Sequence, residues 1–62
     1  MSIYKAWAGN DQGASVDVAH GITFTSIRRA EQAARAEFAQ GWTIHVIDNN
    51  NGQEVKKFKI RG

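Results

Sequence analysis

The pattern of apolar and polar positions divides this chain into one helical segment flanked by two pairs of strands. Residues 25–41 carry the only long helical period. Their apolar residues recur at spacings of three, four and four, which places them along one side of a helix: Ile27, Ala30, Ala34 and Phe38. Because this stripe is narrow and consists mostly of small residues, we expect a flat partner, a sheet, to lie close against it.

Both ends of this helix carry residues that favour a helix end. Thr25 or Ser26 can accept a hydrogen bond from a free backbone N–H of the first turn. Gly41 suits the left-handed conformation that often follows a helix. We therefore expect the helix to run from this cap up to Gly41.

Before the helix, alternation predicts two strands, over residues 3–8 and 14–19, joined by a turn rich in Gly, Asn and Asp. Val16 and Val18 share one face of the second strand. We expect both valines, together with Trp7 of the first strand, to join the core.

After the helix, alternation resumes over residues 42–47 and again from residue 55. A two-residue turn would mix apolar with basic side chains on the core face. A three-residue loop, 50–52, instead places Ile44 opposite Phe58, and the apolar pattern favours this register. A loop of this kind holds its last residue, Gly52, at positive φ. The same register predicts three pairs on the outer face: Ile47 with Val55, His45 with Lys57, and Thr43 with Lys59.

These elements predict one α+β domain over residues 1–62, in the order strand, strand, helix, strand, strand. The helix would cover one face of an antiparallel-rich four-stranded sheet. The strand order in space stays open. Besides the helical stripe, the expected core consists of Trp42, Ile44, Phe58 and Ile60, joined by the two valines and Trp7.

Composition narrows the classes of function. The 62 residues include no Cys, so neither a disulfide nor a thiolate zinc site can form. No apolar run approaches membrane-spanning length, and the first residues lack the apolar core of a secretory signal. We therefore expect a soluble, cytoplasmic protein that does not bind a membrane.

Candidate catalytic residues are few. The two histidines are His20 and His45, and no nucleophile motif or phosphate-loop spacing is present. His45 with Asp48 or Glu54 can be drawn as a base and its orienting carboxylate. A histidine on an exposed strand position is the more ordinary interpretation. We expect a protein that is not an enzyme and that needs no metal or cofactor.

Binding surfaces are the better candidates, and the formal net charge of +2 is unevenly spread. Four basic residues lie within the last seven positions: Lys56, Lys57, Lys59 and Arg61. Such a cluster can meet nucleic acid or an acidic protein. It can equally be a solvated strand face that keeps a sheet edge from aggregating. An exposed aromatic side chain beside these residues would suit base stacking.

The outward helix face is a further candidate, with Arg28 and Arg35 exposed and Glu31 within i, i+4 reach of Arg35. The candidate partner-binding residues are therefore His45, Ile47, Val55, Lys56, Lys57, Lys59, Arg61, Arg28 and Arg35.

A sequence pattern in the second part of the chain adds a resemblance. The pattern is Ser26-Ile27-x-x-Ala30-x-x-x-Ala34, then Gly41, then Ile44-x-Val46-Ile47-Asp48 running into Asn51-Gly52. With it, residues 22–55 resemble very small phage-encoded proteins, the type I-F anti-CRISPR proteins. The resemblance implies a non-enzymatic inhibitor in the cytoplasm of a bacterial host. Such a protein binds a CRISPR effector complex and blocks its DNA path or its conformational change.

One departure from many anti-CRISPR proteins is the charge, since those proteins are often acidic mimics of DNA and this chain is slightly basic. The similar family touches its target with basic residues, which directs attention to Lys56, Lys57 and Lys59. Three hypotheses follow: an inhibitor of a host protein or ribonucleoprotein complex, a nucleic-acid-binding module that uses the basic strand, and a homodimer. The homodimer would form through the Ile47–Val55 face or a free edge strand.

Overall fold

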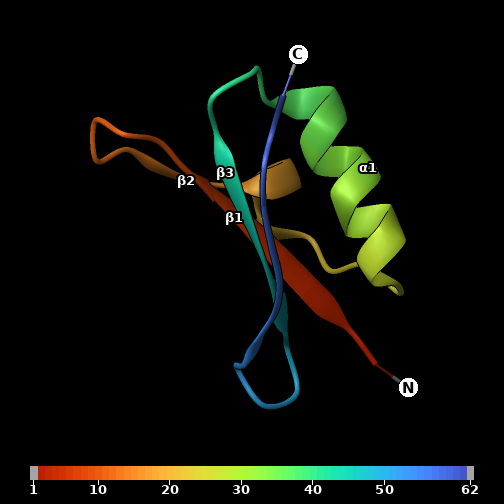
Figure 1. Ribbon diagram of the computed structural model, residues 1–62. Helices are drawn as coiled ribbons and strands as arrows, with labels where there is room; N and C mark the ends of the chain where they lie inside the picture. The colour runs from red at the N-terminus through yellow and green to blue at the C-terminus, as the bar shows by residue number, and fades with distance from the viewer. Residues whose placement is uncertain (1, 62) are drawn as a thin grey trace.

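The computed structural model describes residues 2–61 and confirms the predicted order of elements. The elements are β1 (Tyr4–Gly9), β2 (Ser15–Asp17), the 3₁₀ turn η1 (Val18–Gly21), α1 (Ile27–Glu37), β3 (Thr43–Asp48) and β4 (Glu54–Lys59). The strands form one antiparallel sheet in the order β2-β1-β3-β4. α1 lies on one side of this sheet, where it contacts η1, β1 and β3 (Figure 1). The fold is therefore the predicted α+β class.

The hydrophobic core lies between α1 and the sheet. Its buried side chains come from every layer of the fold: Ala6, Ala8, Val18, Ala30, Ala34, Ile44, Val46 and Ile60. The predicted core positions Trp42 and Phe58 pack against this cluster while remaining partly exposed. Alanines on both α1 and β1 have no side chain beyond Cβ, so the helix can lie close to the sheet.

The helix is shorter than predicted because it ends at Glu37. Phe38 has extended dihedral angles (φ −111°, ψ 146°), and its N–H donates to the carbonyl of Ala34 (2.9 Å). Leaving the helix here brings the Phe38 ring to 5.2 Å from the ring of Trp42, measured between centroids. Gly41 has positive φ (102°), as expected, but it lies in the turn before β3 and is not the helix cap.

The start of α1 yields the first testable prediction. The Ser26 hydroxyl accepts a hydrogen bond from the backbone N–H of Arg29 (3.1 Å), so Ser26 is the N-cap. We expect Ser26→Ala to lower the free energy of unfolding by about 1 kcal/mol, because one helix N–H loses its partner. The matched control is Thr25→Ala, an exposed position just outside the cap. Urea denaturation measures both, and equal losses would contradict this cap assignment.

The second strand is also shorter than predicted. β2 has three residues, and the chain then bends into η1, where Ala19 and His20 adopt left-handed dihedral angles (φ 51° and 58°). The Glu37 carboxylate accepts the Ala19 N–H (2.7 Å) and so holds this bend against the end of α1. The bend buries Val18 completely, whereas Val16 stays on the edge strand and is 45% exposed. The prediction that both valines join the core is therefore wrong for Val16.

The pairing of β3 with β4 confirms most of the predicted register. Ile44 lies opposite Phe58, and two further predicted pairs occur: His45 with Lys57, and Thr43 with Lys59. Gly52 has the predicted positive φ (75°). The apolar pattern thus predicted correctly which side chains of the two strands share a face.

The turn of this hairpin differs from the prediction. The backbone hydrogen bond from the Asp48 N–H to the Gln53 carbonyl (2.9 Å) encloses a loop of four residues, 49–52, in place of the predicted three. The Asp48 carboxylate supports this loop by accepting the backbone N–H two residues ahead (2.8 Å). A β-bulge beyond the loop restores the expected register. Within it Ile47 lies opposite Glu54, and Val55 is the additional residue. The predicted pairing of Ile47 with Val55 is therefore wrong.

Candidate functional site

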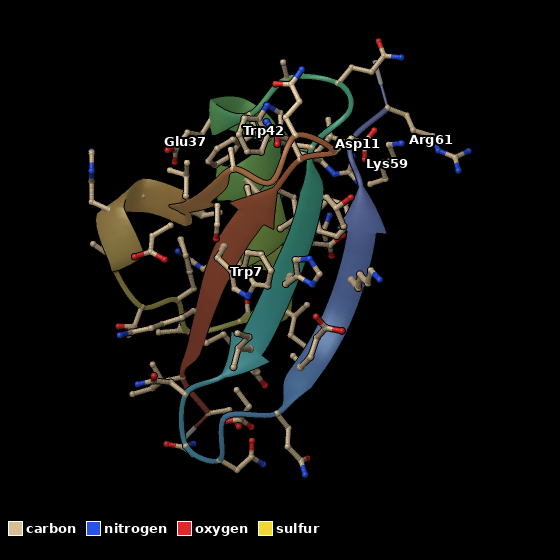
Figure 2. The ribbon with its side chains drawn as sticks, turned by 90° about the vertical axis from the view of Figure 1, so that its left-hand side faces the viewer. Trp7, Asp11, Glu37, Trp42, Lys59 and Arg61 are labelled. Carbon is tan, nitrogen blue, oxygen red and sulfur yellow. The ribbon has the colours of Figure 1, made fainter. Side chains whose placement is uncertain are left out.

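The sheet face turned away from α1, here called the open face, carries Trp7. Ala6 and Ala8 are buried on the helix side, so the residue between them projects to the opposite side of β1. Figure 2 looks onto the open face and shows Trp7 in front of β1. The prediction that Trp7 joins the core is therefore wrong, because the close approach of the helix leaves room only for the alanines.

Trp7 stacks on His45, which lies directly opposite it on β3. The ring centroids are 3.9 Å apart and the ring planes differ by 10°. His45 Nδ1 lies at a hydrogen-bonding distance of 2.5 Å from Glu54 Oε1 on β4. Side chains from three neighbouring strands therefore hold an aromatic ridge, Trp7 and His45, on the open face.

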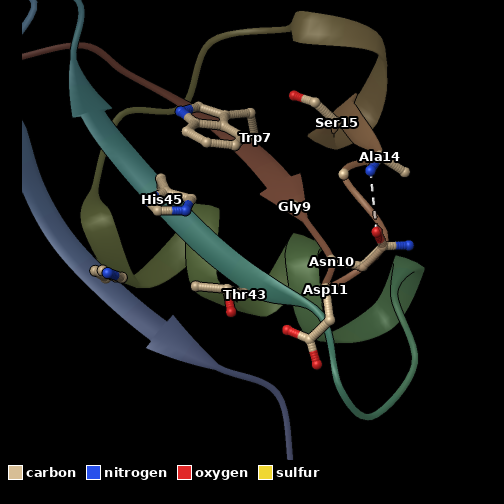
Figure 3. Close-up of a pocket in the computed structure, with 10 residues that line it drawn as sticks. Trp7, Gly9, Asn10, Asp11, Ala14, Ser15, Thr43 and His45 are labelled. Carbon is tan, nitrogen blue, oxygen red and sulfur yellow. Dashed lines mark hydrogen bonds between the residues drawn. The ribbon is translucent and has the colours of Figure 1, made fainter.

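A shallow hollow of about 450 Å³ adjoins the aromatic ridge (Figure 3). Gly9 is part of its lining, and a Cβ at this position would lie 3.2 Å from Cζ3 of Trp7. Another part of the lining is the β1–β2 loop, where the Asn10 side-chain oxygen accepts the backbone N–H groups of Gln12 (2.9 Å) and Ala14 (3.0 Å). The hollow thus has an aromatic side, small residues and a loop braced by a side chain.

A row of basic side chains follows β4 on the same face. Lys57 and Lys59 lie opposite the open-face residues His45 and Thr43. Arg61 continues the alternation, because Ile60 between them is buried and its N–H donates to the carbonyl of Trp42 (2.8 Å). We call Lys57, Lys59 and Arg61 the basic row. Figure 2 shows Asp11, Lys59 and Arg61 toward the same end of the sheet. Two acidic residues lie near the row: Asp11, which lines the hollow together with Lys57, and Glu54, on β4 itself.

Two of the predicted binding residues have other partners. Lys56 Nζ lies 3.1 Å from Glu31 Oε2, on the helix side of the sheet, where Lys56 pairs with the buried Val46. The Arg35 guanidinium lies 4.6 Å from the centroid of the Phe58 ring, a cation–π distance. Glu31 therefore pairs with Lys56, and Arg35 lies over the Phe58 ring, in place of the expected pairing of Glu31 with Arg35.

The remaining predicted residues divide between the two layers. Ile47 shares the open face with His45, two residues away on β3. Arg28 is exposed on α1, in the other layer, and Val55 is exposed in the bulge. The open face therefore unites His45, Ile47 and the basic row, whereas Lys56, Arg28 and Arg35 lie apart from them.

Sequence reasoning assigned Trp7 to the core and so missed the indole that shapes this surface. It named Asp48 or Glu54 as the carboxylate partner of His45, and in the structure the partner is Glu54. For Trp7 a signal was available, since two alanines flank it and small residues suit the side that faces an alanine-rich helix. The choice between Asp48 and Glu54 could not be made from sequence, because the position of Glu54 depends on the bulge.

No family model, curated protein or solved structure matches this chain. Over residues 2–61, no group of three or more His, Asp or Glu side chains is placed to hold a metal ion. In the same part of the chain, no helix has the length and apolar character needed to cross a membrane. The fold and its surface define a small α+β domain whose antiparallel sheet is covered by a helix on one face.

Proposed function

We propose that this domain is a small non-enzymatic binding protein and that its open face meets the partner. The aromatic ridge carries this proposal. Tryptophan side chains are highly buried on average, whereas Trp7 lies on the solvent side of the sheet. His45 stacks on Trp7, and Glu54 in turn contacts His45. Protein-binding surfaces are enriched in Trp and Arg at their centres and have polar rims. Lys57 and Lys59 provide such a rim on the β4 side.

The partner that we propose is a protein or ribonucleoprotein complex of a bacterial host, and most specifically a CRISPR effector. This identity rests on the resemblance of residues 22–55 to type I-F anti-CRISPR proteins. In this form the domain acts in the host cytoplasm and prevents the complex from binding its target DNA or from being activated. Because the open face carries basic and aromatic groups, we propose that it works by contact and not by mimicking DNA.

A phage infection assay tests this proposal. Expression of the protein in a strain whose type I-F system targets a phage should restore plaque formation. We expect Lys57→Glu with Lys59→Glu to abolish this protection of the phage, because both charges on the open face are reversed. The matched control reverses Arg28 and Arg29 to Glu on the exposed side of α1 and should leave protection intact.

Two outcomes of this assay would contradict the proposal in different ways. If the unaltered protein does not restore plaques, the protein is not an inhibitor of this system. If the helix variant loses protection while the β4 variant keeps it, the interface lies on α1. Circular dichroism of each variant establishes that the fold is retained.

The positive charges of β4 disfavour a homodimer formed through this strand. Antiparallel pairing of two β4 edges would bring lysines of the two copies close together, and like charges across strands are destabilising. Lysines on an edge strand commonly prevent such pairing. The free edge of β4 is therefore better suited to remain unpaired than to join a second copy.

A further inference from the structure

We propose that the hollow and the basic row together bind single-stranded nucleic acid, with a base in the hollow and phosphates along β4. The inference rests on the proposed function, because it uses the same open face and names the chemistry that this face recognises. In a ribonucleoprotein partner, the nucleic-acid component would supply this ligand.

The hollow offers what an unpaired base requires. The indole of Trp7 gives an aromatic surface in the lining, and Gly9 lets this ring lie close to the backbone, because a Cβ there would be only 3.2 Å from Cζ3 of Trp7. Ser15 and Thr43 lie on either side of Gly9 in the sheet register and line the hollow with hydroxyl groups. A base has both a π-face and an edge of donors and acceptors, so it can use both kinds of group. If the ligand were instead an aliphatic side chain, it would offer these hydroxyl groups no hydrogen-bond partner.

The basic row offers sites for the backbone of the same strand. Alternate residues of a β-strand lie roughly 6.6 Å apart, twice the rise of one residue. Lys57, Lys59 and Arg61 therefore form a line of cations that can follow successive phosphates of an extended strand. Lys57 also lines the hollow, so the row begins where the base would lie. A duplex cannot use this arrangement, because its bases are stacked and paired away from such a hollow.

Asp11 limits the affinity and also provides a test. This carboxylate lines the hollow together with Lys57, so it opposes the binding of a phosphate there. Removing its charge should strengthen binding if the ligand is polyanionic. We therefore expect Asp11→Asn to tighten binding several-fold at low salt, where the electrostatic contribution is largest.

The test is fluorescence anisotropy with labelled single-stranded RNA and DNA oligonucleotides, and with a duplex of the same sequence as a comparison. We expect the single strand to bind more tightly than the duplex. Trp7→Leu should weaken this binding about tenfold without changing the charge, because the stacking surface is lost. Lys57→Gln with Lys59→Gln should weaken it and reduce its dependence on salt. The matched control, Arg28→Gln with Arg29→Gln, removes the same charge from α1 and should leave the affinity unchanged.

A second measurement reports on the hollow directly. Trp42→Phe leaves Trp7 as the only tryptophan, so its fluorescence should change when the oligonucleotide binds, in step with the anisotropy. The inference is overturned if the duplex binds as tightly as the single strand and Trp7→Leu has no effect, since the contact is then only electrostatic. It is also overturned if no oligonucleotide binds at low salt. If plaques are nevertheless restored in the infection assay, the proposed function stands with a protein surface as its target.

Discussion

Replacing Ile44 with alanine should leave most of the protein unfolded at room temperature. Ile44 lies on β3 beneath α1 with 0% exposure, and it is among the largest side chains that the fold buries completely. Removing a buried Ile side chain to Ala typically costs about 2–5 kcal/mol, which combines lost burial with the cavity left behind. A single core in a domain of this size rarely supplies more than about 3–5 kcal/mol. The expected loss is therefore comparable with the whole stability of the domain.

The matched control for this change is Ile22→Ala. Ile22 is 57% exposed, so its removal should alter the free energy of unfolding by no more than about 0.5 kcal/mol. Urea denaturation followed by circular dichroism measures both variants. If the Ile44 and Ile22 variants are equally stable, β3 does not face the helix as described.

Replacing Ala34 with leucine should also destabilise the protein strongly, although leucine is a good helix former. Ala34 has 0% exposure and belongs to the same buried cluster as the alanines of β1, between α1 and the sheet. Three additional carbon atoms have no space in this layer, so either the helix or its neighbours must move. Such overpacking typically costs about 1–3 kcal/mol.

Ala36→Leu tests whether the effect comes from packing and not from helix propensity. Ala36 lies on the same helix and is exposed, so leucine there should be nearly neutral. Thermal unfolding of the two variants gives the comparison. A stable Ala34 variant would show that α1 is not pressed close to the sheet.

The helix and the second hairpin could be predicted from sequence because their signals are periodic. The spacing of Ile27, Ala30 and Ala34 predicts the face of α1 that packs on the sheet, and both alanines are buried. The match of Ile44 with Phe58 predicts the strand register, although the loop and the bulge that produce it were not foreseen. The longer loop and the bulge compensate each other, so Ile44 still lies opposite Phe58. A hydrophobic pattern predicts this pairing of residues but not the loop and the bulge that produce it.

The first hairpin was harder to predict because tertiary packing decides it. Alternation places the side chain of Trp7 on the other face of the strand from those of Ala6 and Ala8, but it does not predict which face the helix covers. The small residues of β1 face α1, and the tryptophan is therefore on the open face. Gly21 indicates an interruption after the second strand, but the left-handed dihedral angles of Ala19 and His20 could not be predicted from sequence, because positive φ is uncommon for residues other than glycine.

The candidate site was predicted only in part for the same reason. Correct register was enough to group His45 with Lys57 and Lys59. Charge alone also included Lys56, which instead pairs with Glu31 on the helix side. The hollow depends on Gly9 and the β1–β2 loop, so only the three-dimensional arrangement shows it.

The proposed binding surface requires that the open face is exposed in the isolated protein. A soluble paramagnetic agent, added during nuclear magnetic resonance measurements, broadens the signals of groups that solvent reaches. We expect it to broaden the indole N–H of Trp7 and the side chains of Lys57 and Lys59, while the Ala34 methyl stays protected, at every protein concentration. If Trp7 and Lys57 are protected while Arg28 is broadened, another segment or a second copy covers this face, and the proposed binding surface is wrong.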